Sequence, residues 1–163
     1  MDNHQVYQWL DEVTDPEVPV LTVNDLGIIR DVAILTNDQE PAVIVTITPT
    51  YSGCPAMDVI STNIRMVLRS HGIKNITIRN RLSPAWTTDW MTAEGKRKLT
   101  EYGIAAPQYQ VKDANILFET IKVPCPRCLS THTEMVSQFG ATSCKSLYKC
   151  LDCLEPFEYF KCH

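Results

Sequence analysis

The chain has 163 residues, enough for one domain of ordinary size or for a small domain with an appendage. Hydrophobic residues make up 44 %, which allows a core, but no apolar run approaches the ~18 residues that a membrane span needs. The formal net charge of −4 excludes a general electrostatic attraction to nucleic acid. The polar, acidic start of the chain lacks a signal-peptide pattern, so we expect a cytoplasmic protein.

The first hundred residues alternate between helical and strand patterns. Apolar residues at helical spacing and runs of β-branched residues predict, in chain order, a helix over 4–13, strands over 28–35 and 42–49 joined as a hairpin, a main helix over 55–71, a strand over 75–81 and a helix over 92–102. Gly72 is placed to end the main helix, and the Thr92 hydroxyl to cap the last one. This order predicts a compact α/β domain over residues 1–104.

The composition changes after that domain. Residues 105–122 are the predicted linker, and residues 123–163 form a second module in which cysteines, lysines and aromatic residues dominate. A tail this short cannot fold on apolar burial alone and needs a cross-link, such as a bound metal ion or disulfide bonds. We therefore predict an α/β protein in which a small α+β domain is followed by a β module that its cysteines cross-link.

Two CxxC motifs provide candidate residues for this cross-link: Cys125-Pro-Arg-Cys128 and Cys150-Leu-Asp-Cys153. Four thiolates from two tight turns can surround one ion as a tetrahedron, which predicts a zinc ribbon with a structural zinc. Iron in the same cage, as in rubredoxin, is an alternative, because four thiolates accept both ions. Free or disulfide-bonded cysteines are the other alternative, but metal-type spacing favours a reducing compartment.

Cys144 and Cys162 remain outside this set. Either one can replace a cysteine of the CxxC motifs or serve a second metal, and Cys162 lies beside His163 as a candidate metal-binding pair, but a buried thiol is the preferred interpretation for each. With five basic and four acidic side chains, residues 122–163 have no basic stripe. We therefore expect the module to have a structural or protein-contact role and not to bind nucleic acid.

Cys54 stands apart, directly before Pro55 and the main predicted helix. Proline suits a first helical turn, so Cys54 lies at or next to the N-cap, where unpaired N–H groups and the helix dipole favour a reactive thiolate. Gly53 allows a sharp turn, and Thr50 and Ser52 can supply hydroxyl donors. The alternative is a small buried residue that caps the core.

Two further pairs have both a structural and a functional interpretation. Asp15 and Glu17 flank a proline, which is typical of a turn, although they become functional if their loop folds against the start of the main helix. Trp86 and Trp90 form either a lid packed over the core or an exposed patch that docks a partner. The four histidines show no ligand or catalytic spacing.

Three stretches covering roughly residues 15–104 resemble the SufT-like family of iron–sulfur assembly domains: DPEVPVLTVNDLGIIRDV, VTITPTYSGCPAMDVI and SPAWTTDWMTAEGKRKLTEYGI. The tail, with CPRC and FGATSCKSLYKCLDCLEPFEYFKC, resembles the PaaD-type proteins of bacterial phenylacetate degradation, which are encoded with a multicomponent phenylacetyl-CoA epoxidase. The resemblance implies that the family's DPE signature falls on residues 15–17 and its reactive cysteine on Cys54.

The resemblance also implies a function and partners. It suggests an accessory protein that assists iron or iron–sulfur maturation of the oxygenase or reductase of the epoxidase, with a transient iron or iron–sulfur unit at Cys54. The alternative is a noncatalytic structural subunit of that complex. A thiol enzyme is the weakest alternative, because no histidine base is placed beside Cys54. Whether the chain forms a homo-oligomer stays open.

Overall fold

The computed structural model describes residues 1–36, 40–108 and 122–161. Its contacts divide the chain into two compact units, which are Met1–Trp86 with Trp90–Thr92, and Thr87–Asp89 with Ala93–His163. Within the described ranges, no helix is both long enough and apolar enough to cross a membrane. Most of the expected linker, residues 109–121, lies outside the described residues.

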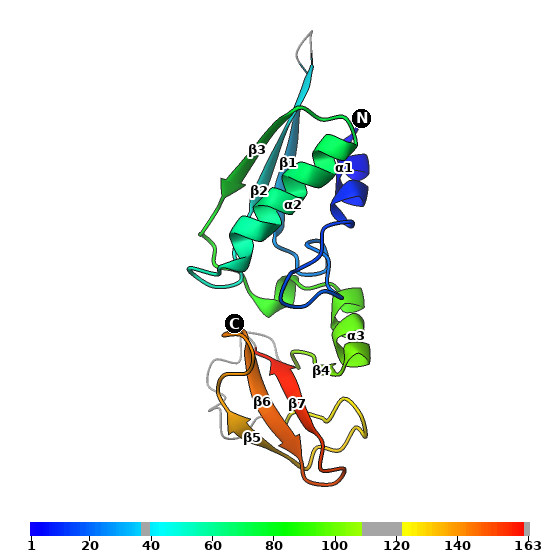
Figure 1. Ribbon diagram of the computed structural model, residues 1–163, viewed down its shortest axis with the longest axis vertical. Helices are drawn as coiled ribbons and strands as arrows, with labels where there is room; N and C mark the ends of the chain where they lie inside the picture. The colour runs from blue at the N-terminus through cyan, green and yellow to red at the C-terminus, as the bar shows by residue number, and fades with distance from the viewer. Residues whose placement is uncertain (37–39, 109–121, 162–163) are drawn as a thin grey trace. The chain divides into compact units, whose positions relative to one another are not determined.

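The first unit is an α/β layer (Figure 1) made of α1 (Asn3–Leu10), β1 (Ile29–Thr36), β2 (Pro41–Ile47), α2 (Ala56–Ser70) and β3 (Asn75–Asn80). The sheet has the order β1-β2-β3, with β1 and β2 antiparallel and β2 and β3 parallel. A parallel pair needs a crossover connection, and α2 provides it. The predicted order of helices and strands is confirmed for this unit.

The core of this unit follows the two periodicities of the sequence. The side chains of Val43, Val45 and Ile47 alternate along β2 and are buried. On α2, the buried face consists of Ala56, Ile60, Ile64 and Leu68. The indole ring of Trp9, on α1, stacks on His71 at the C-terminal end of α2 with 4.5 Å between ring centroids. These contacts fix α2, and with it the turn that leads into the helix.

Two tryptophans, Trp86 and Trp90, pack against loop residues of the first unit. Trp86 is buried, and its indole Nε1 donates a hydrogen bond of 2.8 Å to the carbonyl oxygen of Leu26. The guanidinium of Arg30 lies 3.6 Å from the ring centroid of Trp90. Gly27 has a φ of +67°, and a Cβ there would lie 2.1 Å from the Trp90 carbonyl oxygen, so only glycine fits. The structure supports the packed interpretation of Trp86.

The second unit is a small four-stranded sheet. Its elements are α3 (Ala93–Tyr102), β4 (Ile104–Ala105), β5 (Thr133–Ser137), β6 (Lys145–Cys150) and β7 (Pro156–Phe160), preceded by the 3₁₀ turn η1 (Thr88–Trp90). The strand order is β4-β7-β6-β5. The sequence pattern groups α3 with the first domain, whereas the contacts group it with the second unit, because the β4 strand that follows it pairs with β7.

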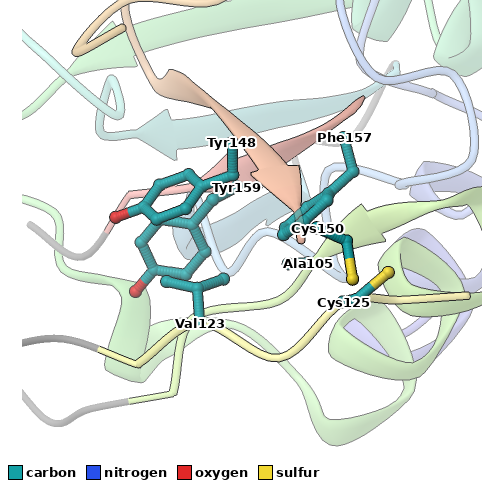
Figure 2. Close-up of a cluster of buried hydrophobic side chains, with 7 residues drawn as sticks. All are labelled: Ala105, Val123, Cys125, Tyr148, Cys150, Phe157 and Tyr159. Carbon is teal, nitrogen blue, oxygen red and sulfur yellow. The ribbon is translucent and has the colours of Figure 1, made fainter. Parts of the chain in front are cut away.

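Aromatic and cysteine side chains form the core of the second unit (Figure 2), which consists of Ala105, Val123, Cys125, Tyr148, Cys150, Phe157 and Tyr159. Tyr148 lies at the centre, with ring centroids 5.9 Å from Phe157 and 5.7 Å from Tyr159. Burial raises the pKa of the Tyr148 hydroxyl above its usual value. This core is small, so it depends on the two cysteines that belong to it.

An ion pair crosses from β6 to β7 in the same unit. The Lys145 ammonium, buried to 5 % side-chain exposure, donates a 2.8 Å hydrogen bond to the Glu158 carboxylate. The Ala141 amide donates to the other Glu158 oxygen at 2.8 Å. Burial by itself raises the pKa of Glu158, but the hydrogen bonds from Lys145 and Ala141 and the lysine charge outweigh it and leave the pKa below its usual value. The ionised pair is therefore the stable form.

Replacing Glu158 by Gln is expected to destabilise the second unit by about 3 kcal/mol, because it leaves the Lys145 charge buried without a counter-charge. The folded pKa of Glu158 is depressed, so the pair stabilises the protein above the unfolded pKa and that stability is lost as pH falls through the folded pKa. Urea unfolding from pH 7 to pH 3, followed by near-ultraviolet circular dichroism, measures both effects. Glu101→Gln, which breaks an exposed pair with Arg97, is the control and should change little. A Glu158→Gln protein as stable as wild type at pH 7 would contradict the assignment.

Candidate metal centre and candidate thiol site

Four cysteines of the second unit converge on one point. The sulfur atoms of Cys125, Cys128, Cys150 and Cys153 all lie within 4.8 Å of one another. The Sγ atoms of Cys125 and Cys153 are 3.7 Å apart, and those of Cys128 and Cys150 are 3.5 Å apart. Figure 2 shows the sulfurs of Cys125 and Cys150 turned toward each other beside the aromatic core. The structure thus brings together the four residues that the CxxC spacing predicted.

Two tight turns present these sulfurs. In the first, the Leu129 amide donates to the Cys125 carbonyl oxygen at 2.9 Å, and the Cys125 amide donates to the Ser130 carbonyl oxygen at 2.9 Å. In the second, the Cys150 amide donates to the Glu155 carbonyl oxygen at 3.0 Å. The first cysteine of each motif is buried and the second is exposed. One half of the four-sulfur site therefore belongs to the core, and the other half faces solvent.

A hydrogen-bonded brace links the two turns. Asp152 lies between the cysteines of the second motif, and its carboxylate accepts hydrogen bonds from the Ser130 hydroxyl and, at 2.9 Å, from His132 Nδ1. The amide of His132 donates to the Ser130 hydroxyl at 3.0 Å. These two hydrogen bonds lower the pKa of Asp152, with the hydroxyl contributing most. Sequence reasoning missed this brace, because a pairing between Ser130 and Asp152 has no local signal.

The backbone of the second turn favours thiolate. Hydrogen bonds from the amides of Cys153 and Asp152 lower the pKa of Cys150 to about 7, with the Cys153 amide contributing most. The Glu155 amide acts in the same direction on Cys153, but burial and the neighbouring thiols outweigh it and raise the pKa of Cys153 to about 12. Four thiolates so close together cannot all be ionised without a cation.

The donor set fits a tetrahedral metal ion. Zn–S bonds of about 2.3 Å place the corners of a tetrahedron roughly 3.8 Å apart, which is close to the two sulfur–sulfur distances above. All four donors are soft thiols, the set that zinc and iron prefer over magnesium or calcium. The ligands of such an ion would be Cys125, Cys128, Cys150 and Cys153.

We expect the purified protein to hold about one ion per chain, and we expect Cys125→Ser to release it and unfold the second unit while the first stays folded. Metal and protons compete for the thiolates, so affinity should fall as pH decreases through about 7, near the pKa of Cys150. Elemental analysis with chelator competition at pH 6, 7 and 8 measures both. Cys144→Ser is the matched control, since Cys144 is a buried thiol outside the cluster. Full metal content in Cys125→Ser would exclude this ligand set.

The second candidate site, Cys54, lies on the turn that enters α2. The Cys54 amide donates to the Tyr51 carbonyl oxygen at 3.3 Å, and the Met57 amide donates to the Cys54 carbonyl oxygen at 3.2 Å. Pro55 is the N-cap residue of α2, and no side chain caps the helix there. Gly53 has a φ of +79°, which confirms the predicted role of glycine in this turn. Cys54 is half-buried, so it is neither a sealed core residue nor a fully exposed one.

The structure gives one of the residues predicted to assist Cys54 a structural role and places two others beside a cavity. Thr50 and Ser52 line a cavity of about 280 Å³ together with Trp86, and, within the described part of the chain, neither hydroxyl bonds to the Cys54 sulfur. The Asp15 carboxylate, only 8 % exposed, accepts hydrogen bonds from the amides of Glu17 at 2.7 Å and Val18 at 2.8 Å. This geometry supports the turn interpretation of Asp15.

The remaining cysteines separate by burial. Cys144 is buried and its sulfur lies 3.0 Å from the Thr142 hydroxyl, which supports the buried-thiol interpretation. Cys162 and His163 lie outside the described residues.

With metal bound, Cys54 is expected to react with iodoacetamide faster than Cys144, because it is half-buried and Cys144 is buried. Mass spectrometry of the native protein at short reaction times measures the order. Denatured protein, in which both thiols are free, is the control. If Cys144 reacts first, Cys54 is a core cap and not an accessible thiol.

Comparison with known proteins agrees with this division of the chain. Residues 3–78 match the family model described as iron-sulfur cluster assembly protein, and residues 112–161 match the PaaD zinc beta ribbon domain. The chain is 28 % identical to the crystal structure of a domain of unknown function, DUF59, from Bacillus anthracis, with a TM-score of 0.52 over 59 % of this chain and 89 % of that one. The fold and the four-cysteine site thus define an iron–sulfur assembly domain followed by a zinc-ribbon module.

Sequence relatives define the family more narrowly. The chain is 43 % identical over 159 residues to a putative 1,2-phenylacetyl-CoA epoxidase subunit of Escherichia coli, covering 98 % of this chain and 92 % of the relative. It is 37 % identical to an Fe-S protein maturation auxiliary factor of Porphyromonas gingivalis, over 58 % of this chain and 87 % of the relative. The chain belongs to the PaaD family.

Proposed function

We propose that this protein is an accessory factor of the phenylacetyl-CoA epoxidase system that delivers iron or an iron–sulfur unit to the oxygenase or reductase component. The observation that carries the proposal is a half-buried cysteine at the start of a helix, in a unit that matches the iron-sulfur cluster assembly family. The name of the Escherichia coli relative supplies the system. The protein is not catalytic by itself in this proposal.

The chemistry of Cys54 suits transfer better than storage. Iron–sulfur clusters are held stably by several ligands, commonly four cysteines, and the turn at Cys54 supplies one. A unit bound by one thiolate is held weakly, so a partner with more ligands can remove it. In this proposal Thr50 and Ser52 contribute hydroxyl groups near the turn, and Glu17 is a further positioning candidate. Asp15 acts indirectly, since its carboxylate holds the Glu17 and Val18 amides.

The four-cysteine centre has a different role in the proposal. We infer that it holds a structural zinc, for which the match to a zinc beta ribbon family is the support. Four ligands close the coordination sphere of zinc, so the site stabilises the second unit and does not exchange cargo. The zinc-ribbon module, which we place at residues 123–163, is then free to contact the epoxidase components. The first domain is proposed to end near residue 104.

A structural role within the epoxidase is the second candidate, favoured by the name of the relative, which calls it a component of that enzyme. The two candidates differ in stoichiometry. An assembly factor is absent from the finished epoxidase, whereas a structural component is present at a fixed ratio. Native mass spectrometry of the epoxidase purified through its oxygenase component separates them.

Cys54→Ser is expected to leave folding intact, because serine is nearly isosteric with cysteine and Cys54 lies on a turn. The epoxidase should still assemble in cells carrying this variant. The iron content of its oxygenase or reductase should be lower than with wild-type protein by roughly tenfold or more, because the accessory protein has lost a metal ligand. Iron per oxygenase and per reductase, measured at matched expression, is the readout. Cys144→Ser, the same substitution at a buried thiol outside both candidate sites, is the control. Equal iron content and turnover with wild-type and Cys54→Ser protein would end the delivery proposal.

A further inference from the structure

The three-stranded sheet of the first unit has two unlike faces. One face lies under α2 (Figure 1) and carries the buried residues Val43, Val45 and Ile47 of β2. Because successive side chains of a strand point to opposite sides of a sheet, the residues between these three share the other face. The strand register gives three rows across that second face: Asp31 with Thr46 and Arg79, Ala33 with Ile44 and Thr77, and Leu35 with Ala42 and Asn75. These nine residues are called the open face below.

The open face is more apolar than a sheet face that water covers. Leu35 is 48 % exposed, and the other aliphatic residues of the face, Ala33, Ala42 and Ile44, are half-buried. A strand with a helix on one side and water on the other normally alternates apolar and polar residues, whereas β2 reads AVIVTI. Continuous apolar runs are typical of strands that are covered on both faces. The composition of β2 therefore indicates a second layer over the open face.

The charges in one row of the open face determine what can form this layer. Asp31 on β1 and Arg79 on β3 are both exposed, and they lie on either side of Thr46, which is buried. Within the described part of the chain, neither charge belongs to an ion pair. The row is thus negative at its β1 edge and positive at its β3 edge, and a covering surface must carry the opposite arrangement.

The other described charges on these strands and next to their ends leave this pattern in place. The guanidinium of Arg30 lies over the Trp90 ring, 3.6 Å from its centroid. At the opposite end of the sheet, Glu40 and Lys74 pair with each other at 2.5 Å. Arg81 directly follows the end of β3, so it adds positive charge to the edge that already carries Arg79.

A second copy of the chain has the required arrangement. A two-fold axis that runs parallel to β2, between two open faces, lays β1 of each copy over β3 of the other. Asp31 of each copy then faces Arg79 of the other copy, and the two Ile44 side chains meet at the axis. An axis perpendicular to the strands would lay β1 over β1, so within the open face each charge would meet only like-charged or uncharged residues. Charge therefore selects one way of packing the two sheets, which in such sandwiches lie about 10 Å apart.

We propose that two copies of the chain dimerise through their open faces, with an Asp31–Arg79 ion pair on each side of a two-fold axis parallel to β2. The open face is smaller than a standard protein interface, so the dimer should be weak and should form at micromolar or higher concentrations. This inference goes beyond the proposed function and does not depend on cargo transfer by Cys54.

The test measures self-association of the full-length, metal-loaded protein by analytical ultracentrifugation from about 1 μM to 1 mM, a range that detects a weak dimer. Asp31→Arg and Arg79→Asp should each weaken self-association by about tenfold or more, because each variant replaces both ion pairs with like charges. An equimolar mixture of the two variants should dimerise about as tightly as wild type, since each copy supplies the charge that the other lacks. Arg69→Asp, the same change at an exposed arginine of α2, is the control and should leave self-association unchanged.

A second set of variants tests the apolar contact and the folding of the first unit. Ile44→Thr keeps a β-branched residue in β2 but removes apolar surface at the axis, so it should weaken self-association by about threefold or more. Val59→Thr, at an exposed residue of α2, is the matched control. Urea unfolding of dilute protein checks that each variant folds. The neutral variants Asp31→Asn and Arg79→Gln should weaken self-association less than the reversals, and they replace a reversal that does not fold.

Recovery of the dimer in the mixture, together with a weaker Ile44→Thr dimer, supports the inference. Wild-type protein that stays monomeric over the whole range overturns it. So does a dimer that the charge variants or Ile44→Thr leave unchanged, because such a dimer forms through another surface. A mixture of folded Asp31→Arg and Arg79→Asp proteins that remains monomeric also overturns it, since the two charges then do not face each other.

Discussion

The second unit depends on the convergence of four thiols at one point. Its core is small, and Cys125 and Cys150 are part of it, so the site and the core cannot form separately. Their partners Cys128 and Cys153 are exposed, and the sulfur–sulfur distances of 3.5 and 3.7 Å would bring like charges together if the thiols ionised alone. A divalent cation would remove this repulsion, because each of the four thiolates would then bond to the ion. We therefore expect metal binding and folding of this unit to be one event, for which the amides that favour a Cys150 thiolate prepare the turn.

The first unit is built differently, because its single cysteine, Cys54, is half-buried and is not part of its core. Apolar faces on α2 and β2 supply its core, and the stack of Trp9 on His71 holds the end of α2. The turn from Tyr51 to Cys54 leads into that helix, and Cys54 is half-buried. Under the proposed function this single thiol exchanges a ligand, whereas the four cysteines of the second unit hold one ion permanently.

Features of this structure could be predicted from the sequence where they depend on residues close together in the chain. The order of elements around α2 and the set of four ligand cysteines were predictable, because apolar periodicity and CxxC spacing are local patterns. The aromatic residues of PFEYF favour a strand, and β7 forms there, but so short a run between cysteines has no period that assigns it to one face. Pairing of β4 with β7 and the brace from Ser130 to Asp152 were not predictable, because each joins residues distant in sequence.

In the proposed function the two units of one chain have separate roles, and their covalent connection has a physical consequence. Once one unit is bound to a client, the other stays tethered to it, and the encounter between thiol and client becomes intramolecular. A thiol that holds its cargo weakly then needs no affinity of its own for the client, which lets it keep the lability that transfer requires. Weak binding at one site is tolerable when a separate site provides the affinity.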